Sequence, residues 1–209
     1  RTPLTAIRGF AELHRQGAVS GEEQTKELVA RIERESMRMS TLVEDLLMLA
    51  RMDQGPKMEI KPVNISELVS DAVESARAAA PGHPIKLTSG NDIYALGDAN
   101  RIHQVVANLL ANARVHTPVG TNINVSVNQS DAEVQVVVSD NGPGLSEKDR
   151  EKIFERFYRV DPSRTRTSEE GSGLGLSIVD AVMRAHGGHV SVDSKLGEGA
   201  TFTLHFPLN

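Results

Sequence analysis

The sequence predicts an α+β fold, in which an antiparallel helical hairpin is followed by an α/β sandwich with helices over one face of a mixed sheet. Three observations support this prediction. Apolar residues recur every three or four positions through residues 2–52, with one short break. Gly55 and Pro56 then interrupt the pattern. Beyond them, alternating runs typical of strands lie between amphipathic helical segments, so two domains are expected, 1–55 and 56–209.

The composition is that of a globular protein without a nucleic-acid surface. The chain has 209 residues, a formal net charge of −5 and 24% charged residues, which argues against nucleic acid as the main partner. It contains no Cys, which excludes disulfides and thiolate chemistry. No stretch approaches the ~18 consecutive apolar residues of a membrane span. A cytoplasmic location is therefore expected, with any membrane anchor in segments outside this sequence.

The first two helices are expected at residues 2–16 and 22–52, joined by a turn at residues 17–21. The second helix keeps its apolar residues in a heptad register that is broken at Glu35. A single hairpin has one seam and leaves much of its apolar stripe in contact with water. We therefore expect two copies to pair into a dimeric four-helix bundle. Packing of the hairpin on the rest of the same chain is the alternative.

The second domain is expected to begin with a strand at residues 58–63. Asn64, with Glu67 three residues later, forms a capping-box start for a helix through residue 80. Alternation and turn residues predict the remaining elements. Strands are expected at 85–88, 93–96, 122–128, 133–139, 189–193 and 200–206, and helices at 100–116, 146–157 and 174–186. The last two strands are expected to form a closing hairpin.

Three glycine-rich motifs punctuate the second domain: DNGPG at 140–144, GSGLGL at 171–176 and GEGATF at 197–202. Glycine permits positive φ angles and a close approach of the backbone to a ligand. The middle motif opens into a helix, whose N-terminal N–H groups and dipole favour phosphate. The spacing fits neither a P-loop nor a Rossmann fingerprint. Each motif alone could be a plain turn, but together with a second set of residues they indicate a nucleotide site.

That second set lies in the expected helix 100–116. Asn108 and Asn112 are four residues apart, so they share one helix face, which Gln104 extends. An amide oxygen is a hard ligand for Mg²⁺, an ion that keeps several waters and bridges to nucleotide phosphates. The alternative is a solvated polar face. Asp140, at the end of a predicted strand, is placed to accept a hydrogen bond from a base amine.

Five segments, in this order, resemble the N, G1, F, G2 and G3 boxes of sensor histidine kinases, whose GHKL-type ATPase superfamily includes gyrase and MutL. They are NLLANARVHTP at 108–118, DNGPG, FERFYR at 154–159, GSGLGL and GEGATF. The opening RTPLTAIRGF resembles the end of the H-box, which places the phosphoacceptor histidine three residues before Arg1. The segment RGFAELHRQGA is similar to PhoR-like sensors of actinobacteria.

The resemblance implies that the chain is the kinase core of a membrane-anchored two-component sensor. Such a core transfers the γ-phosphoryl group of ATP, bound with Mg²⁺, to a histidine. The group then passes to an aspartate on the receiver domain of a response regulator, and dephosphorylation of that regulator is also implied. The hairpin would form the homodimer. Two rival interpretations are an ATP-gated switch that moves no phosphate and a gyrase-like or MutL-like ATPase. The ATPase predicts a hydrolytic Glu at the position of Asn108.

The resemblance also implies roles for individual residues in binding the cofactor. Asn112 would coordinate Mg²⁺ with support from Asn108, and Asp140 would bind the adenine amine. The other cofactor contacts would come from His116, Gly142, Gly144, Gly171, Gly173, Leu174, Gly175, Leu176 and Thr201. Of these, Thr201 is expected near the adenine, and the glycines of 171–175 at the hinge of the ATP lid.

Three catalytic residues are implied as well. Arg159 and Arg164 match basic lid positions that contact the terminal phosphate, where positive charge stabilises transfer. Thr2, four residues after the H-box histidine, matches the position that orients water for dephosphorylation. The chain departs from the N-box pattern at Val115, where Lys or Arg is usual. The basic residue here is Arg114 instead. A shift of one residue turns a side chain by ~100° about the helix axis. We therefore expect Arg114 to miss the phosphates.

Other histidines allow different interpretations. His14 lies in the first helix but lacks H-box neighbours, so it is not expected to be phosphorylated. His186 and His189, in HGGH, could suggest a metal site. Two imidazoles make an incomplete site, however, and the glycines are typical of a helix C-cap. The cap is the prediction.

Overall fold

The computed structural model describes residues 2–19, 21–55, 58–79, 81–90, 92–160 and 172–208, and the side chain of Thr2 lies outside this description. The chain forms two compact units, Arg1–Met48 and Leu49–Asn209. The division falls within the second helix, a few residues before the expected linker. In the described ranges, no helix is both long and apolar enough to cross a bilayer.

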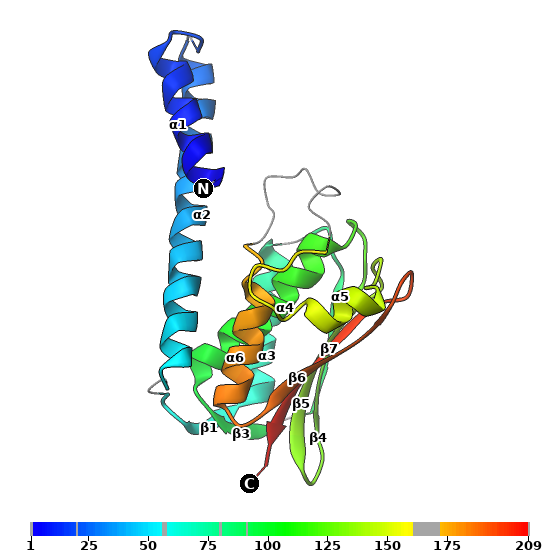
Figure 1. Ribbon diagram of the computed structural model, residues 1–209. Helices are drawn as coiled ribbons and strands as arrows, with labels where there is room; N and C mark the ends of the chain where they lie inside the picture. Colours follow the sequence, from blue (N-terminus) through cyan, green and yellow to red (C-terminus); the bar gives the residue numbers. More distant parts are fainter. Residues whose placement is uncertain are drawn as a thin grey trace. The chain divides into compact units, whose positions relative to one another are not determined.

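The first unit contains the helical hairpin (Figure 1). α1 spans Thr2–Arg15 and α2 spans Glu22–Asp53, close to the predicted ranges. In the turn between them, Gly17 and Gly21 have φ angles of 71° and 98°, at which a residue with a side chain would be strained. Leu28 is buried, but several apolar side chains of this unit are exposed. They are Leu4, Leu13, Val29, Met37, Val43, Leu46 and Leu47.

The second unit is built on a five-stranded mixed sheet of order β2-β4-β5-β7-β6. β2 and β4 run parallel, and the other neighbours pair antiparallel. The strands are β2 (Ile85–Ser89), β4 (Ile123–Gln129), β5 (Glu133–Asp140), β6 (His189–Lys195) and β7 (Gly199–Pro207). β1 (Lys61–Asn64) and β3 (Tyr94–Gly97) form a separate two-stranded antiparallel sheet.

Three helices cover one face of the large sheet: α3 (Ile65–Ala79), α4 (Ala99–His116) and α6 (Gly175–Ala185) (Figure 1). Side chains alternate between the two faces of a strand. Along β4, β5 and β7, every second residue is buried, and the residues between them are more exposed. The buried aliphatic residues, together with Phe202 and Phe206, form the core between sheet and helices. The predicted α+β architecture is confirmed.

One helix is shorter than predicted. The sequence predicts a helix over 146–157, but α5 spans Glu147–Lys152 and is followed by a turn. Beyond the turn, Phe157 has a φ angle of 65° and its N–H donates to Gly173 O (2.9 Å). This contact couples the end of the FERFYR segment to the GSGLGL motif.

Local hydrogen bonds explain other boundaries. β1 begins at Lys61 rather than at 58, and the N–H of Glu59 donates instead to the Asp98 carboxylate (3.2 Å). The predicted cap of α3 is confirmed, because a backbone N–H in its first turn donates to Asn64 Oδ1 (3.2 Å). His186 is the C-cap of α6, as predicted.

Candidate functional site

The asparagine row lies on α4 and meets the start of α6. The Asp98 carboxylate caps α4 by accepting two backbone N–H groups of its first turn. Helical spacing then places Asn108, Asn112 and His116 on one face. Asn108 Nδ2 donates to Gly175 O (3.4 Å), so this amide joins α4 to the second glycine motif. Asn112 is half-buried one turn further along the same face.

The second glycine motif leads into α6. Leu174 is fully buried at the N-cap and anchors the motif. Gly173 has a φ angle of 73°, and a Cβ there would lie 3.1 Å from Phe157 Cα. Both the backbone angle and this contact require glycine. Gly175 and Leu176 begin the helix, where N–H groups without a helical partner can bind an anion.

Asp140 ends β5 and is 9% exposed. In the sheet register it lies between Ile123 of β4 and Ala200 of β7. Its Oδ1 accepts the N–H of Gly142 (2.8 Å). Burial raises the pKa of Asp140, and this outweighs the opposite effect of the Gly142 and Ala200 N–H groups and of nearby His116. A carboxylate has more acceptor positions than these N–H groups occupy, so it can accept a further hydrogen bond from a ligand.

Close packing requires glycine at both glycine positions of the DNGPG motif, Gly142 and Gly144. A Cβ at Gly142 would lie 2.5 Å from Thr117 Cγ2 and 2.7 Å from Asp140 Oδ1. Gly144 has a φ angle of 67°, and a Cβ there would lie 2.1 Å from Lys195 O. The motif therefore touches the end of α4 on one side and the β6–β7 turn on the other.

Thr201 lies on the opposite face of the sheet from the helices. Along β7, Ala200 and Phe202 are buried, whereas Thr201 between them is half-buried. Because side chains alternate along a strand, Thr201 points away from the helical layer. Ala200 is the β7 residue that pairs with Asp140. The sequence predicted Thr201 near the adenine, whereas in the strand register Ala200, not Thr201, lies beside Asp140.

The residues with an expected catalytic role belong to other segments of the chain. Arg159 is exposed and follows the turn after α5. Arg164, like Gly171 of the second glycine motif, lies outside the described residues. Thr2 is the first residue of α1 and belongs to the other unit.

Three hydroxyl groups that hold the motifs in place were not expected from the sequence. Ser177 Oγ donates to Leu174 O (2.8 Å), and Thr117 Oγ1 donates to Ala113 O (2.7 Å) at the end of α4. Ser194 Oγ on β6 accepts the N–H of Leu145 and donates to Gly199 O. Each hydroxyl lies within a few residues of a motif, which is a weak signal. A single sequence does not reveal the partner.

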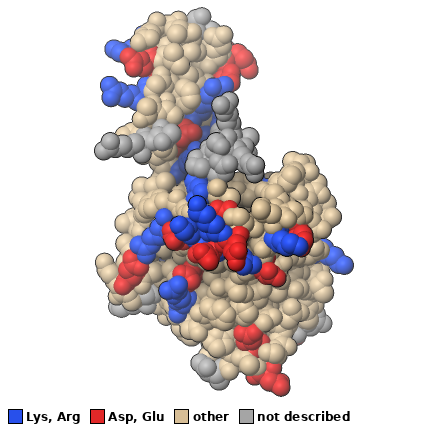
Figure 2. All heavy atoms as spheres, turned by 45° about the vertical axis from the view of Figure 1, so that its right-hand side comes forward, with Lys and Arg blue, Asp and Glu red and all other residues tan. Residues whose placement is uncertain are grey.

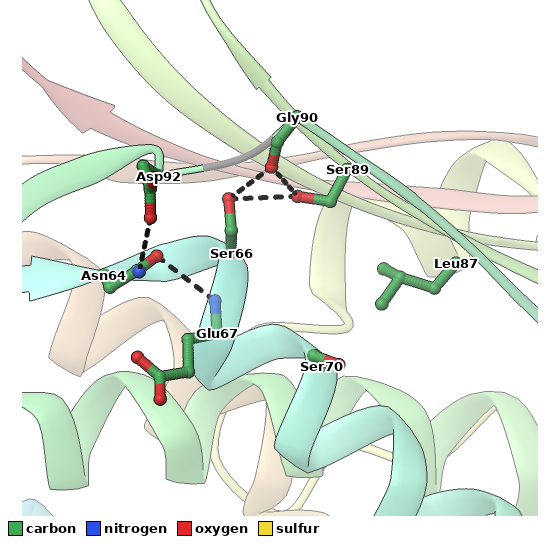
Figure 3. Close-up of a pocket in the computed structure, with 8 residues that line it drawn as sticks. All are labelled: Asn64, Ser66, Glu67, Ser70, Leu87, Ser89, Gly90 and Asp92. Carbon is green, nitrogen blue, oxygen red and sulfur yellow. Dashed lines mark hydrogen bonds between the residues drawn. The ribbon is translucent and has the colours of Figure 1, made fainter.

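A separate cavity of about 350 Å³ lies between the start of α3 and the end of β2 (Figure 3). Most polar groups that line it are hydrogen-bonded within the lining. Ser66, Ser89 and Gly90 are hydrogen-bonded to one another, and Asn64 donates to Asp92. The strand register places this cavity at the end of β2 away from the DNGPG motif. None of the expected cofactor residues lines it.

Charged side chains of both signs are interspersed on the face drawn in Figure 2. They do not gather there into one basic surface. Among the described residues, no cluster of three or more His, Asp or Glu side chains is arranged to hold a metal ion. A metal ion at the asparagine row would therefore need amide and ligand oxygens, which are the hard donors that Mg²⁺ prefers.

Two family models match the chain. Residues 97–209 match the histidine kinase-, DNA gyrase B- and HSP90-like ATPase, and residues 1–55 match the His Kinase A (phospho-acceptor) domain. The probable sensor histidine kinase TcrY of Mycobacterium tuberculosis is 44% identical over 210 residues, which covers all of this chain and 44% of TcrY. The chain thus spans less than half the length of this relative.

Solved structures are similar over almost the whole chain. Full-length ShkA in complex with AMPPNP has a TM-score of 0.77 and 30% identity, covering 99% of this chain and 43% of ShkA. Histidine kinase ThkA in complex with the response regulator protein TrrA has a TM-score of 0.77 and 25% identity, covering 99% of this chain and 58% of ThkA. The chain therefore belongs to the histidine kinase-, DNA gyrase B- and HSP90-like ATPase family and, within it, to the sensor histidine kinases.

Proposed function

We propose that this chain binds ATP with Mg²⁺ and forms the phosphotransfer core of a sensor histidine kinase. The observation that carries the proposal is the buried Asp140 carboxylate, which lies against Gly142 at the end of the helix that bears the asparagine row. The AMPPNP complex of ShkA and the response regulator complex of ThkA support the nucleotide and the partner class.

The adenine base binds at Asp140. Its exocyclic amine donates to the carboxylate, and Gly142 leaves the ring room because it has no side chain. Guanine presents a carbonyl oxygen at the corresponding position, and two acceptors facing each other repel. Because a buried group left without its partner costs affinity, the site favours ATP over GTP.

The phosphates bind between α4 and the start of α6. Asn112 offers an amide oxygen to Mg²⁺, which neutralises phosphate charge when bound. Asn108 keeps this face against Gly175 through its amide N–H. The N–H groups at the start of α6 bind phosphate oxygens. Arg159 and Arg164 stabilise the negative charge that develops on the transferred group.

The transfer step is a displacement at the γ-phosphorus. The neutral Nε2 of a histidine upstream of Arg1 attacks, the bond between the γ-phosphorus and the bridging oxygen breaks, and ADP leaves with the electron pair. The phosphoryl group then passes to an aspartate of a receiver domain. Thr2, at the start of α1, orients the water that later dephosphorylates this aspartate. The hairpin pairs with that of a second copy.

The test uses γ-labelled ATP and the chain extended upstream by its native segment. We expect acid-labile, alkali-stable label on the extended chain and none on its Asn112→Ala variant. The matched control is Asn128→Ala, which removes an exposed amide on β4 and retains the label. ATP binding without labelling of the extended chain would contradict phosphotransfer. That result favours the ATP-gated switch, for which the apolar Val115 gives a reason.

A further inference from the structure

Ser194 on β6 connects the DNGPG motif to the GEGATF motif. Its Oγ accepts the N–H of Leu145 (2.8 Å), the residue that follows DNGPG. The same hydroxyl donates to Gly199 O (2.6 Å), the second glycine of GEGATF. One short side chain thus uses its donor and an acceptor position to join two loops that are about 50 residues apart in the sequence.

The two loops fit closely at this junction. The Gly197 N–H donates to Pro143 O (2.8 Å). A Cβ at Gly199 would lie 1.9 Å from Asp140 O, so the backbone of β7 is in direct contact with the residue that receives the base. Protein interiors packed this tightly transmit small displacements. We therefore expect a shift of Leu145 relative to Gly199 to move the Asp140 carboxylate.

We propose that Ser194 is a positioning residue for adenine, which sets the spacing of the DNGPG and GEGATF loops on either side of Asp140. The inference rests on the proposed function, in which Asp140 accepts the adenine amine. Ser194 acts through Leu145 and Gly199 and does not itself touch the nucleotide.

The position of Ser194 predicts which part of the nucleotide is affected. Leu145 and Gly199 flank the strand ends at Asp140, whereas the phosphate groups belong to α4 and the start of α6. Loss of the hydroxyl therefore weakens the binding of adenosine, ADP and ATP by the same factor. In the extended kinase it raises the KM for ATP, while kcat at saturating ATP stays within about twofold.

The experiment measures dissociation constants of adenosine, ADP and ATP by calorimetry. For Ser194→Ala we expect about tenfold weaker binding of all three, because part of the binding energy must then restore the loop spacing that the two hydrogen bonds hold in the free protein. Ser194→Thr keeps the hydroxyl and is expected to restore binding to within about threefold. Ser194→Cys keeps the approximate size of the side chain but is a weaker hydrogen-bond donor. An intermediate loss of affinity in this variant tests the inference even where the alanine variant unfolds.

The matched control is Ser191→Ala, three residues earlier on β6. Ser191 Oγ is hydrogen-bonded to His205 Nε2 (2.9 Å) and contacts neither glycine loop, so its removal leaves all three constants unchanged. Folded Ser194→Ala or Ser194→Cys with wild-type constants overturns the inference, and so does a loss confined to ATP. If the Asp140→Asn variant binds adenosine and ATP as tightly as the wild type does, Asp140 does not receive the base. The proposed function then fails at that step, and the role of Ser194 fails with it.

Discussion

At the scale of single residues, His186 shows how one side chain fixes the geometry around the site. Asp98 N–H donates to His186 Nε2 (3.0 Å), so the proton lies on Nδ1, which faces Val182 O at 2.8 Å. The ring also meets Phe206 edge-on at 6.3 Å. The neutral imidazole thereby ties the end of α6 to the cap of α4, and burial lowers its pKa.

We predict that protonation of His186 destabilises the fold. Its folded-state pKa lies below the ordinary value of 6.5, so the unfolded chain binds more protons in acid. The stability contributed by the neutral ring is present above pH 6.5 and is lost as the pH falls from there towards the folded-state pKa. His186→Gln keeps an acceptor for Asp98 but cannot titrate, so denaturant midpoints between pH 8 and 5 should fall less steeply. His103→Gln, at an exposed position of α4, serves as control, and an unchanged slope for His186→Gln would contradict this assignment.

The two constraints at Gly144 allow a second prediction. Gly144 and Gly187 have similar φ angles of 67° and 73°, but only Gly144 would bring a Cβ against another backbone, at Lys195 O. Gly187→Ala should cost about 1 kcal/mol of unfolding free energy, from the backbone angle alone. Gly144→Ala should cost at least about 2 kcal/mol and abolish ATP binding, because the DNGPG loop must move. Urea denaturation and calorimetry measure both, and equal costs would show that crowding at Gly144 is unimportant.

The sequence predicted the residues that belong to motifs and missed those that support them. Asn108, Asn112 and Asp140 could be identified because residue type and spacing show a helix face and a strand end. The expectation that Thr201 lies near the adenine did not take the register of β7 into account, which pairs Ala200 rather than Thr201 with Asp140. The partners of a serine could not be inferred, because they depend on how distant loops pack.

At the scale of elements, α4 carries the asparagine row, and its first turn depends on Asp98. The carboxylate accepts two N–H groups of α4 through one oxygen and the Glu59 N–H through the other. Capping residues are recognisable in sequence, but this second role is not. The length of α5 also escaped prediction, because the residues after Lys152 form a turn and Phe157 then contacts Gly173 on a distant segment.

We predict that Asp98→Ala lowers the unfolding free energy by about 1–2 kcal/mol, since the first turn of α4 loses its acceptor. Asp98→Asn keeps an oxygen acceptor of comparable capping strength and should cost much less. ATP affinity should fall with Asp98→Ala, because fraying at the start of α4 loosens the helix that bears Asn108. Denaturant unfolding and calorimetry on both variants provide the measurement. Equal costs for alanine and asparagine would mean that the cap does not stabilise α4.

At the scale of the whole molecule, the two units differ in how they bury apolar surface. The second unit encloses its core between one sheet and three helices, a result that strand alternation and helix periodicity predicted. The hairpin unit has two helices, too few to enclose a core of its own. Val29, Val43 and Leu47 are 55%, 49% and 52% exposed, and at 100° per residue they lie on one face of α2. Such a stripe is typical of a helix that packs against another copy.

We predict that the chain is a dimer and that charge on this stripe dissociates it. Val43→Glu and Leu47→Glu each place a carboxylate where the proposed interface excludes water, and an unpaired buried charge is costly. Sedimentation equilibrium over a range of concentrations should give twice the 22.6 kDa chain mass for the wild type and the single mass for the variants. Leu96→Glu is the matched control, because Leu96 is 54% exposed on β3 of the other unit. ATP affinity should be unchanged in all three variants, since Asp140 and the asparagine row lie outside the hairpin. A wild type that stays monomeric at high concentration, or glutamate variants that stay dimeric, would contradict pairing through this face.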